Sequence, residues 1–486
     1  MAILFRMGGD LRERRDAQRR ALGLPGLALL LATVVAVIVG TVYALSPMTV
    51  WFGLAMALLL TCAGTGLPDG ERRWVLSLLV VALFLRLLVI AGFFLLADHD
   101  HHSFSFFFGD ESLAIRRSLL MRNTWLWIPI PPDHLWFVFD RGYGWTGYHY
   151  VLAYLQVLLG PAPYGVHLFN AGLFLAGAVA LHRMVRRAYG PLPALGGLLV
   201  LLFLPSLFLW SISALKESLY FFLMAMALVG TVKAVRASNW SKRLLAIAVS
   251  VGAIGAISTV RAGGFVTVVF GIVSGLVARF ATLRVWLFMA FLIFSSIVGR
   301  YLVTRSDIQD QIMGQLRRAA IVHLGNVRTQ GHAYKLLDQR FYSEGQSSIP
   351  SMTPPEALRF VVRAAVSFVA VPLPWQTASS PMLVFLPQQI VWYALVVLAA
   401  AGFLAGLRRD ALVTFILAGC IFVGAGVIAL HSGNFGSLVR FRDTVVPSVV
   451  WLSALGMVSV LFRLTSRYPV GAPEGGGGRR QGIGKE

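Results

Sequence analysis

Charged side chains are scarce in this chain. They make up 13% of its 486 residues, whereas soluble globular proteins carry roughly 25%. Hydrophobic residues reach 57% and the mean hydropathy is +0.74, which excludes a soluble globular protein. Apolar runs of about 20 residues recur along the chain without the alternation of β-barrel strands. We therefore predict an all-α polytopic membrane protein.

Several chemical signatures are also missing. The only two cysteines, Cys62 and Cys420, lie within apolar runs, which excludes a disulfide framework and a cysteine zinc site. The chain has no Gly-rich phosphate loop, Ser-His-Asp pattern or nucleotide-binding motif, which argues against a cytosolic nucleotide as direct donor. Its two halves show no repeat and no matched broken helices of the kind used by inverted-repeat transporters.

Acidic residues are half as many as basic ones, 21 against 42, and the formal net charge is +21. The basic residues stand in short clusters beside the apolar runs. This arrangement indicates control of membrane topology and contact with anionic lipid headgroups. We therefore expect membrane lipids as partners and no nucleic acid.

The basic clusters set the predicted topology. Arginines in residues 1–23 place the N-terminus in the cytoplasm. The first apolar run, Leu24–Leu45, is too long for a cleavable signal and is expected to be a retained span. About twelve transmembrane helices fit within residues 24–464, with both chain ends inside. The Gly-rich segment 465–486 is predicted to be a disordered cytoplasmic tail.

Three outer loops follow from this topology, at residues 98–163, 304–383 and 431–443. The first two are large and too polar to span a membrane. Each is predicted to carry a short interfacial helix, Tyr148–Leu159 in the first and Ala357–Val371 in the second.

The first outer loop contains a run of aromatic rings, Phe104–Phe108, that leads through Gly109 into Asp110 and Glu111. Rings partition to the membrane–water interface, whereas charged carboxylates are costly near lipid. A carboxylate held at a half-desolvated interface can act as general base for a hydroxyl or amine. Asp110 and Glu111 are therefore the candidate catalytic residues, and an exposed loop with an aromatic anchor is the alternative.

Other unusual polar residues fall on the same predicted side of the membrane, and they are candidates for binding the phosphate of an anionic donor. A transporter should instead place special charges near the membrane centre, so one-sided convergence favours chemistry at the outer leaflet. The alternatives are a helix-start charge pair and arginines that reach lipid headgroups. The candidates are Lys216, Glu217, Arg261, Arg440 and Arg442.

Two further expectations concern local geometry. Arg440-Phe441-Arg442, as an extended stretch, would place both guanidinium groups on one face. His149 is a candidate substrate-binding residue, with a plain interfacial position as the alternative. A metal site in the first loop is a further alternative, although clustered histidines in a solvated loop are commonly inert; its residues would be Asp98, His99, Asp100, His101 and His102.

With these motifs in order, the chain resembles the GT-C superfamily of membrane glycosyltransferases, in the branch of protein O-mannosyltransferases and lipid A aminoarabinose transferases. The resemblance covers roughly Trp74 to Leu464 and depends on the order of short motifs. These are Arg86 in the span before the loop, Gly109-Asp110-Glu111, Tyr148-His149-Tyr150, Gly160-Pro161, Val166–Ala171, a late outer loop, and Arg440-Phe441-Arg442 before the last span.

The resemblance implies transfer of a sugar, with inversion, from a polyprenyl-phosphate carrier to a glycan, lipid or protein acceptor at the outer face of a bacterial cytoplasmic membrane. It gives Asp110 the role of base or metal-linked group, with Glu111 as neighbour, and leaves a divalent metal (Mg²⁺ or Mn²⁺) open. It places phosphate contacts on Lys216, Arg261 and the two arginines of the Arg-Phe-Arg segment. Two spans precede the span before the acidic loop, where many relatives have one, so sugar and acceptor stay open.

Other function classes remain as alternatives at this stage. One is a transporter or flippase for a lipid-linked glycan. Another is a polysaccharide polymerase or ligase that uses an undecaprenyl carrier. The last is a structural membrane scaffold.

Overall fold

The computed structural model describes residues 31–41, 46–96, 109–139, 146–162, 164–328, 333–373 and 386–467. Within these ranges the regular structure is helical, and the only β pairing is an isolated bridge between Ala333 and Asn434. The segment 1–23, the aromatic run Phe104–Phe108 and residues 468–486 lie outside the described residues.

Ten helices of the described chain are long and apolar enough to cross a membrane, which confirms the all-α polytopic prediction. The pair α8 (Pro191–Phe203) and α9 (Pro205–Ile212) adds an eleventh when it is taken as one bent span. A shorter apolar helix, Leu31–Thr41, lies in the first predicted span. The ten are α2 (Pro47–Gly64), α3 (Asp69–Leu96), α7 (Gly165–Tyr189), α10 (Glu217–Arg236), α11 (Trp240–Val260), α12 (Ala262–Ala281), α13 (Val285–Thr304), α17 (Leu386–Arg409), α18 (Ala411–His431) and α20 (Val446–Arg467).

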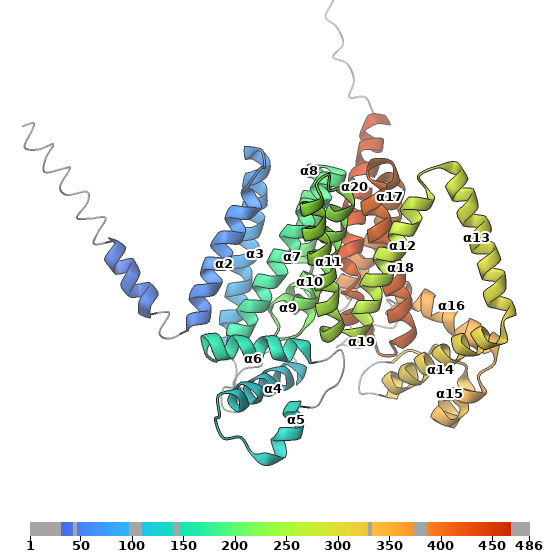
Figure 1. Cartoon of the computed structure of the whole chain (residues 1–486), viewed down its shortest axis with the longest axis horizontal. Helices are drawn as coiled ribbons and strands as arrows, with labels where there is room; N and C mark the ends of the chain where they lie inside the picture. The colour runs from blue at the N-terminus through green and yellow to red at the C-terminus, as the bar shows by residue number, and fades with distance from the viewer. Residues whose placement is uncertain are drawn as a thin grey trace, which may run out of the picture.

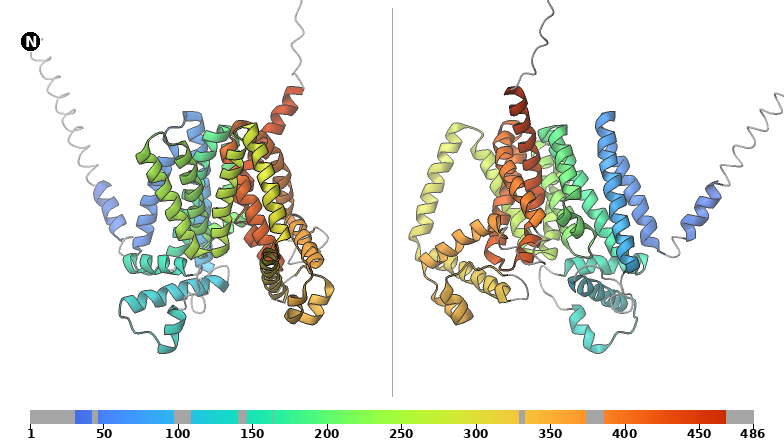
Figure 2. Two further views of the ribbon diagram at one scale, coloured as in Figure 1. Left: turned by 45° about the vertical axis from the view of Figure 1, so that its right-hand side comes forward. Right: turned by 180° about the vertical axis from the view of Figure 1, so that it is seen from behind.

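The remaining helices gather at one end of the bundle, which we name the loop face (Figure 1, Figure 2). One group comes from the first predicted outer loop, with α6 lying across the ends of the spans and α4 and α5 beyond it. A second group comes from the loop 304–383. The helices are α4 (Gly109–Trp125), α5 (Leu135–Phe139), α6 (Gly147–Leu159), α14 (Ser306–Arg328), α15 (Gln339–Glu344), α16 (Pro354–Ala370) and α19 (Phe435–Arg442).

The bent span α8–α9 is held by a buried arginine. Pro205 breaks the helix after Leu204, and the two halves meet at 61°. Arg86 on α3 is fully buried; its Nη2 donates to the carbonyl of Leu202 at 3.0 Å and its Nε to Ser211 Oγ at 2.8 Å. The arginine thus binds both sides of the break. Sequence reasoning missed this break, although Pro205 inside an apolar run was its signal.

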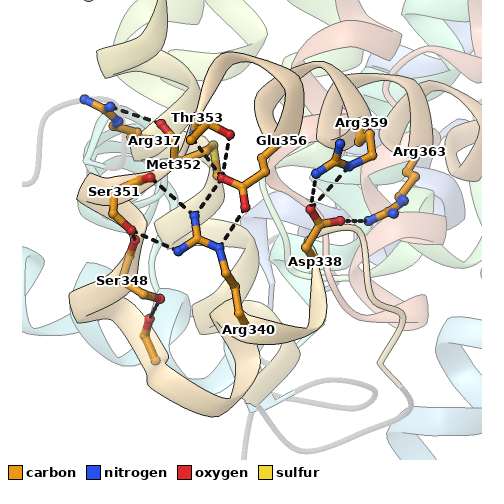
Figure 3. Close-up of polar contacts among 11 residues, drawn as sticks. Arg317, Asp338, Arg340, Ser348, Ser351, Met352, Thr353, Glu356, Arg359 and Arg363 are labelled. Carbon is orange, nitrogen blue, oxygen red and sulfur yellow. Dashed lines mark hydrogen bonds and ion pairs between the residues drawn. The ribbon is translucent and has the colours of Figure 1, made fainter.

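Ion pairs organise the second polar segment (Figure 3). Asp338 accepts hydrogen bonds from Arg359 at 2.6 Å and from Arg363 at 2.8 Å. Arg340 makes two hydrogen bonds of 2.7 Å to Glu356, which hold the pKa of that carboxyl at about 2, below its ordinary value. These pairs join α15 and the residue before it to α16, so the segment is a folded unit at the loop face.

This unit in turn holds the start of α19. Three of its donors reach consecutive carbonyl groups of the loop before that helix, and the ring of Tyr334 stacks on Phe435 at a centroid distance of 5.7 Å. The start of α19 is therefore fixed from outside the bundle. The donors are the side chains of Asn326 and His323 and the backbone N–H of Tyr334, and the acceptors are the carbonyl oxygens of His431, Ser432 and Gly433.

Candidate functional site

The candidate site is built on the corner between α9 and α10, residues 213–217. The side chain of Asn170, fully buried on α7, contacts the carbonyl oxygens of Ser213 at 2.6 Å and Leu215 at 2.8 Å. Its Nδ2 also lies 2.9 Å from the hydroxyl of Tyr148. Because the corner carbonyls are bound from inside the bundle, the next two residues, Lys216 and Glu217, begin α10 at the loop face.

The two adjacent carboxylates at the start of α4 have different surroundings. Glu111 is fully buried, and the backbone N–H of Ala214 donates to its Oε1 at 2.9 Å. The Asp110 side chain is 64% exposed. Successive residues of a helix point about 100° apart, so one carboxylate anchors α4 to the corner while the other faces the loop-face surface.

Arg440 on α19 is the centre of the site. Its Nη1 donates to Asp110 Oδ2 at 2.8 Å, and its Nε donates to Glu217 Oε1 at 2.9 Å. Its Nη2 lies 2.9 Å from the same Glu217 oxygen. The guanidinium also lies over the indole ring of Trp210, 5.3 Å from its centroid. One arginine therefore joins the first polar segment, the α9–α10 corner and the last polar loop.

Arg261 approaches the same carboxylate from the junction of α11 and α12. Its Nη1 is 3.9 Å from Glu217 Oε1, and its guanidinium lies between the rings of Tyr220 and Phe441, at 5.8 and 5.0 Å. Burial lowers the pKa of Arg261. Within the described residues, neither Arg261 Nη1 nor Glu217 Oε2 has a hydrogen-bond partner, so the site keeps one buried donor and one buried acceptor unsatisfied.

Of the two remaining candidates, Lys216 and His149, only Lys216 adds positive charge at pH 7. Burial, with Arg261 and Arg440 nearby, lowers the pKa of Lys216 to about 8. Burial lowers the pKa of His149 to about 4, and the charges of Arg117 and Lys216 contribute to the same shift. His149 is therefore neutral at pH 7, and Lys216 is still largely charged there.

Arg442 does not join Arg440, so the predicted extended stretch with both guanidinium groups on one face was wrong. The Asn434 side chain accepts from the N–H of Gly436 and starts a helix that continues to Arg442. Residues two apart on a helix point to different sides. Arg442 is buried, and it donates to Gln389 Oε1 at 3.0 Å and to the carbonyl of Val371 at 2.6 Å.

Sequence reasoning did not select Asp443 and Trp210, which support the site. The carboxylate of Asp443, which is buried, accepts from Ser206 Oγ at 2.9 Å and from Trp210 Nε1 at 2.6 Å. Burial raises the pKa of Asp443 to about 7. Asp443 therefore positions the indole ring of Trp210, over which the guanidinium of Arg440 lies. A signal was present, because Asp443 is the only acidic residue of the loop 431–443.

An apolar groove of about 700 Å³ runs between α16, α17, α18 and α20. Its lining is formed by aliphatic and aromatic side chains, including Phe368, Trp392 and Phe422. Trp392 also lines a cavity of about 20 Å³ together with Arg442 and Asp443. Asp443 borders a second cavity of the same size, whose wall includes Arg440 and Glu217. The groove and the first of these cavities thus share the wall residue Trp392, and the two cavities share Asp443.

The described residues do not fit a divalent metal. In these ranges no group of three or more His, Cys, Asp or Glu side chains is placed to hold one. Asp110 and Glu217 share the guanidinium of Arg440, and Glu111 accepts from a backbone N–H. The alternative metal cluster at Asp98–His102 lies outside the described residues.

The buried contacts of Arg442 lead us to expect a loss of stability when this arginine is substituted. Arg442→Gln leaves the carbonyl of Val371 and the amide of Gln389 without their buried donor, so we expect a loss of about 1–3 kcal/mol in unfolding free energy. Arg305→Gln is the matched control, because Arg305 is exposed and lies over the Tyr301 ring; it should change stability by less than about 0.5 kcal/mol. Thermal unfolding in detergent measures both. Equal stability of the two variants would make Arg442 a lipid-facing residue instead.

Comparison with known proteins adds no assignment to this geometry. No family model matches the chain, and no curated protein matches it.

Proposed function

We propose that this multi-pass membrane protein is a glycosyltransferase. It would move a sugar from a polyprenyl-phosphate carrier to a glycan, lipid or protein acceptor at the outer face of the bacterial cytoplasmic membrane. The observation that carries the proposal is the meeting of three features at the loop face. A cluster of cations lies beside an exposed carboxylate, Asp110, and shared residues connect this cluster to a large apolar groove.

The cations suit the phosphate of the carrier. Arg440, Arg261 and Lys216 approach Glu217 or its neighbours within a partly buried site. Guanidinium and ammonium groups bind phosphate oxygens by charge-assisted hydrogen bonds, which are stronger away from bulk water. The same groups would stabilise the negative charge that appears on the phosphate when it leaves. The unsatisfied Nη1 of Arg261 is available as a donor.

The apolar groove suits the tail of the carrier. It lies between α16 and three helices that are long and apolar enough to cross the membrane, and its volume of about 700 Å³ is in the range of ligand sites. An isoprenoid chain buries apolar surface there at no cost in unsatisfied polar groups. Trp392, which lines the groove, packs under the guanidinium of Arg442 at 4.9 Å. The tail would therefore enter from the lipid side and lead toward Asp443 and Arg440.

The exposed carboxylate suits the proton transfer. Asp110 would accept the proton of the acceptor hydroxyl or amine while that oxygen or nitrogen forms a bond to the anomeric carbon. The bond from that carbon to the phosphate oxygen breaks, and the electron pair leaves with the lipid phosphate. Glu111 would support the step by holding α4 against Ala214. Inversion at the anomeric carbon is part of the proposal that comes from the GT-C resemblance.

A flippase is supported less well. The buried charge within the membrane-spanning part of α3, Arg86, has all three guanidinium nitrogens bonded to Ser211, Ala82 and Leu202. Arg86 therefore joins α3 to the bent span α8–α9, and its guanidinium nitrogens are already engaged in these contacts. The polar groups with unsatisfied atoms at Arg261 and Glu217 lie at the loop face.

Asp110→Asn should reduce sugar transfer by at least about 100-fold, because it removes the proposed base. The assay uses purified protein, labelled polyprenyl-phosphate sugars and a crude envelope acceptor fraction. Asp133→Asn is the matched control, since Asp133 lies in the same polar segment with a 77% exposed side chain; it should transfer at the wild-type rate. Full transfer by the Asp110 variant would remove the assigned base.

The charge of Lys216 predicts a pH dependence of phosphate binding. Its pKa is lowered to about 8, so the charged form prevails below pH 8 and is lost above it. The affinity for farnesyl phosphate should therefore fall by at least about threefold between pH 7 and pH 9, because Lys216 is half-buried and threefold is the value of an exposed ion pair. Lys216→Gln should bind less tightly at pH 7 and show a flatter profile. An unchanged pH profile in that variant would assign the titration to another group.

The side of the membrane is testable with single cysteines. In a background lacking Cys62 and Cys420, cysteines at Asp133 and Ser343 should react with an impermeant thiol reagent applied to whole spheroplasts, because both positions are exposed at the loop face. A cysteine at Lys242, at the other end of the bundle, should react only after the membrane is opened. The reverse labelling pattern would place the site in the cytoplasm.

A further inference from the structure

Arg440 has no free guanidinium nitrogen. Nη1 is bound to Asp110, whereas Nε and Nη2 both lie 2.9 Å from Glu217 Oε1. The face of the guanidinium is covered by Trp210. Because both carboxylates have the same sign of charge as the phosphate, a phosphate that binds this arginine through two nitrogens competes with at least one of them. The structure indicates which one.

The two carboxylates differ in burial. The Glu217 side chain is 9% exposed and meets Arg440 through two nitrogens, whereas the Asp110 side chain is 64% exposed and meets it through one. An exposed ion pair contributes little to stability, and separating a buried pair leaves a charge without a partner at a much larger cost. Glu217 would therefore keep its arginine, and Asp110 is the partner that an anion displaces.

Displacement would leave Asp110 at the site. Its neighbour Glu111 is buried and bonded to the backbone N–H of Ala214 on the α9–α10 corner. This anchor does not involve Arg440, so α4 keeps its place when the exposed pair opens. The released carboxylate gives up its hydrogen bond from Arg440 Nη1, so that oxygen becomes open to the proton of the acceptor.

We propose that Asp110 is a resident counter-ion of Arg440 which the carrier phosphate displaces, and that this exchange frees the base. This inference rests on the proposed function and adds an order of events to it. The carrier binds first, its phosphate takes the place of the Asp110 carboxylate on Arg440, and the acceptor is deprotonated only afterwards. Before the carrier binds, the base and the phosphate ligand neutralise each other, which protects against proton transfer without a sugar donor in place.

The test measures the affinity of the full-length protein for farnesyl phosphate in phosphatidylcholine nanodiscs. Asp110→Asn removes the competing charge and should bind this probe about two- to fivefold more tightly than the wild type, the equivalent of one exposed ion pair. Asp110→Ala should behave in the same way. Arg440→Gln should bind about tenfold more weakly, since it removes the phosphate ligand. If Asp110 only helped to bind the carrier, its substitution would weaken the binding of farnesyl phosphate.

Two controls separate the possible failures. Asp133→Asn removes one charge from the same polar segment without touching Arg440, so its affinity should equal that of the wild type; tighter binding there would reduce the effect at Asp110 to general electrostatics and overturn the inference. Unchanged or weaker binding by both Asp110 variants, with tight binding by the wild type, also overturns it. Wild-type protein that binds farnesyl phosphate no better than farnesol overturns the proposed donor site, and the inference with it.

Discussion

The buried ion pair between Arg440 and Glu217 is the interaction on which the rest of the site depends. Glu217 begins α10 and Arg440 lies near the end of α19, so the pair joins segments more than 200 residues apart in sequence. Removing either partner would leave an unpaired charge at a half-buried position, which is costly. With the pair in place, Asp110 and Trp210 each contact its guanidinium, and Arg261 approaches its carboxylate.

The scaffold that presents this pair consists of polar side chains that form hydrogen bonds inside the bundle. Asn170 binds the corner carbonyls, and Arg86 binds both sides of the bent span. Asp443 holds the indole beneath Arg440. Each of these side chains is buried, and each would be expensive in an apolar environment without its partners. The site is therefore rigid in its inner parts, whereas its exposed part is the contact of Asp110.

Much of the fold could be predicted from the sequence, because long apolar runs report membrane spans directly and basic clusters report the ends of those spans. The residue types of the site could be selected in the same way, since Asp110, Glu217, Arg261 and Arg440 are unusual charges beside apolar runs. The contacts that each of these charges makes could not be predicted from the sequence. Arg442 looks equivalent to Arg440 in the sequence, yet a helix of eight residues turns it toward Gln389 and away from the site.

The apolar groove and the division between Asp110 and Glu111 required three dimensions. The groove is formed by four helices between residues 354 and 467, and its residues have no distinguishing pattern among so many apolar side chains. Two neighbouring carboxylates acquire opposite surroundings only because one meets the N–H of Ala214. Local sequence therefore identifies the candidates for chemistry, and the packing of distant segments determines what each of them can do.

The central claim is that the cations around Arg440 hold the phosphate of a prenyl carrier. It is tested most directly by a cryo-electron microscopy structure of the protein in nanodiscs with farnesyl phosphate. The account predicts phosphate density within hydrogen-bonding distance of Arg440 and beside Arg261 or Lys216, with the isoprenoid chain leading toward Trp392 and the groove. Phosphate density at the opposite end of the bundle, for example against Arg186, which is paired with Glu71, would contradict it.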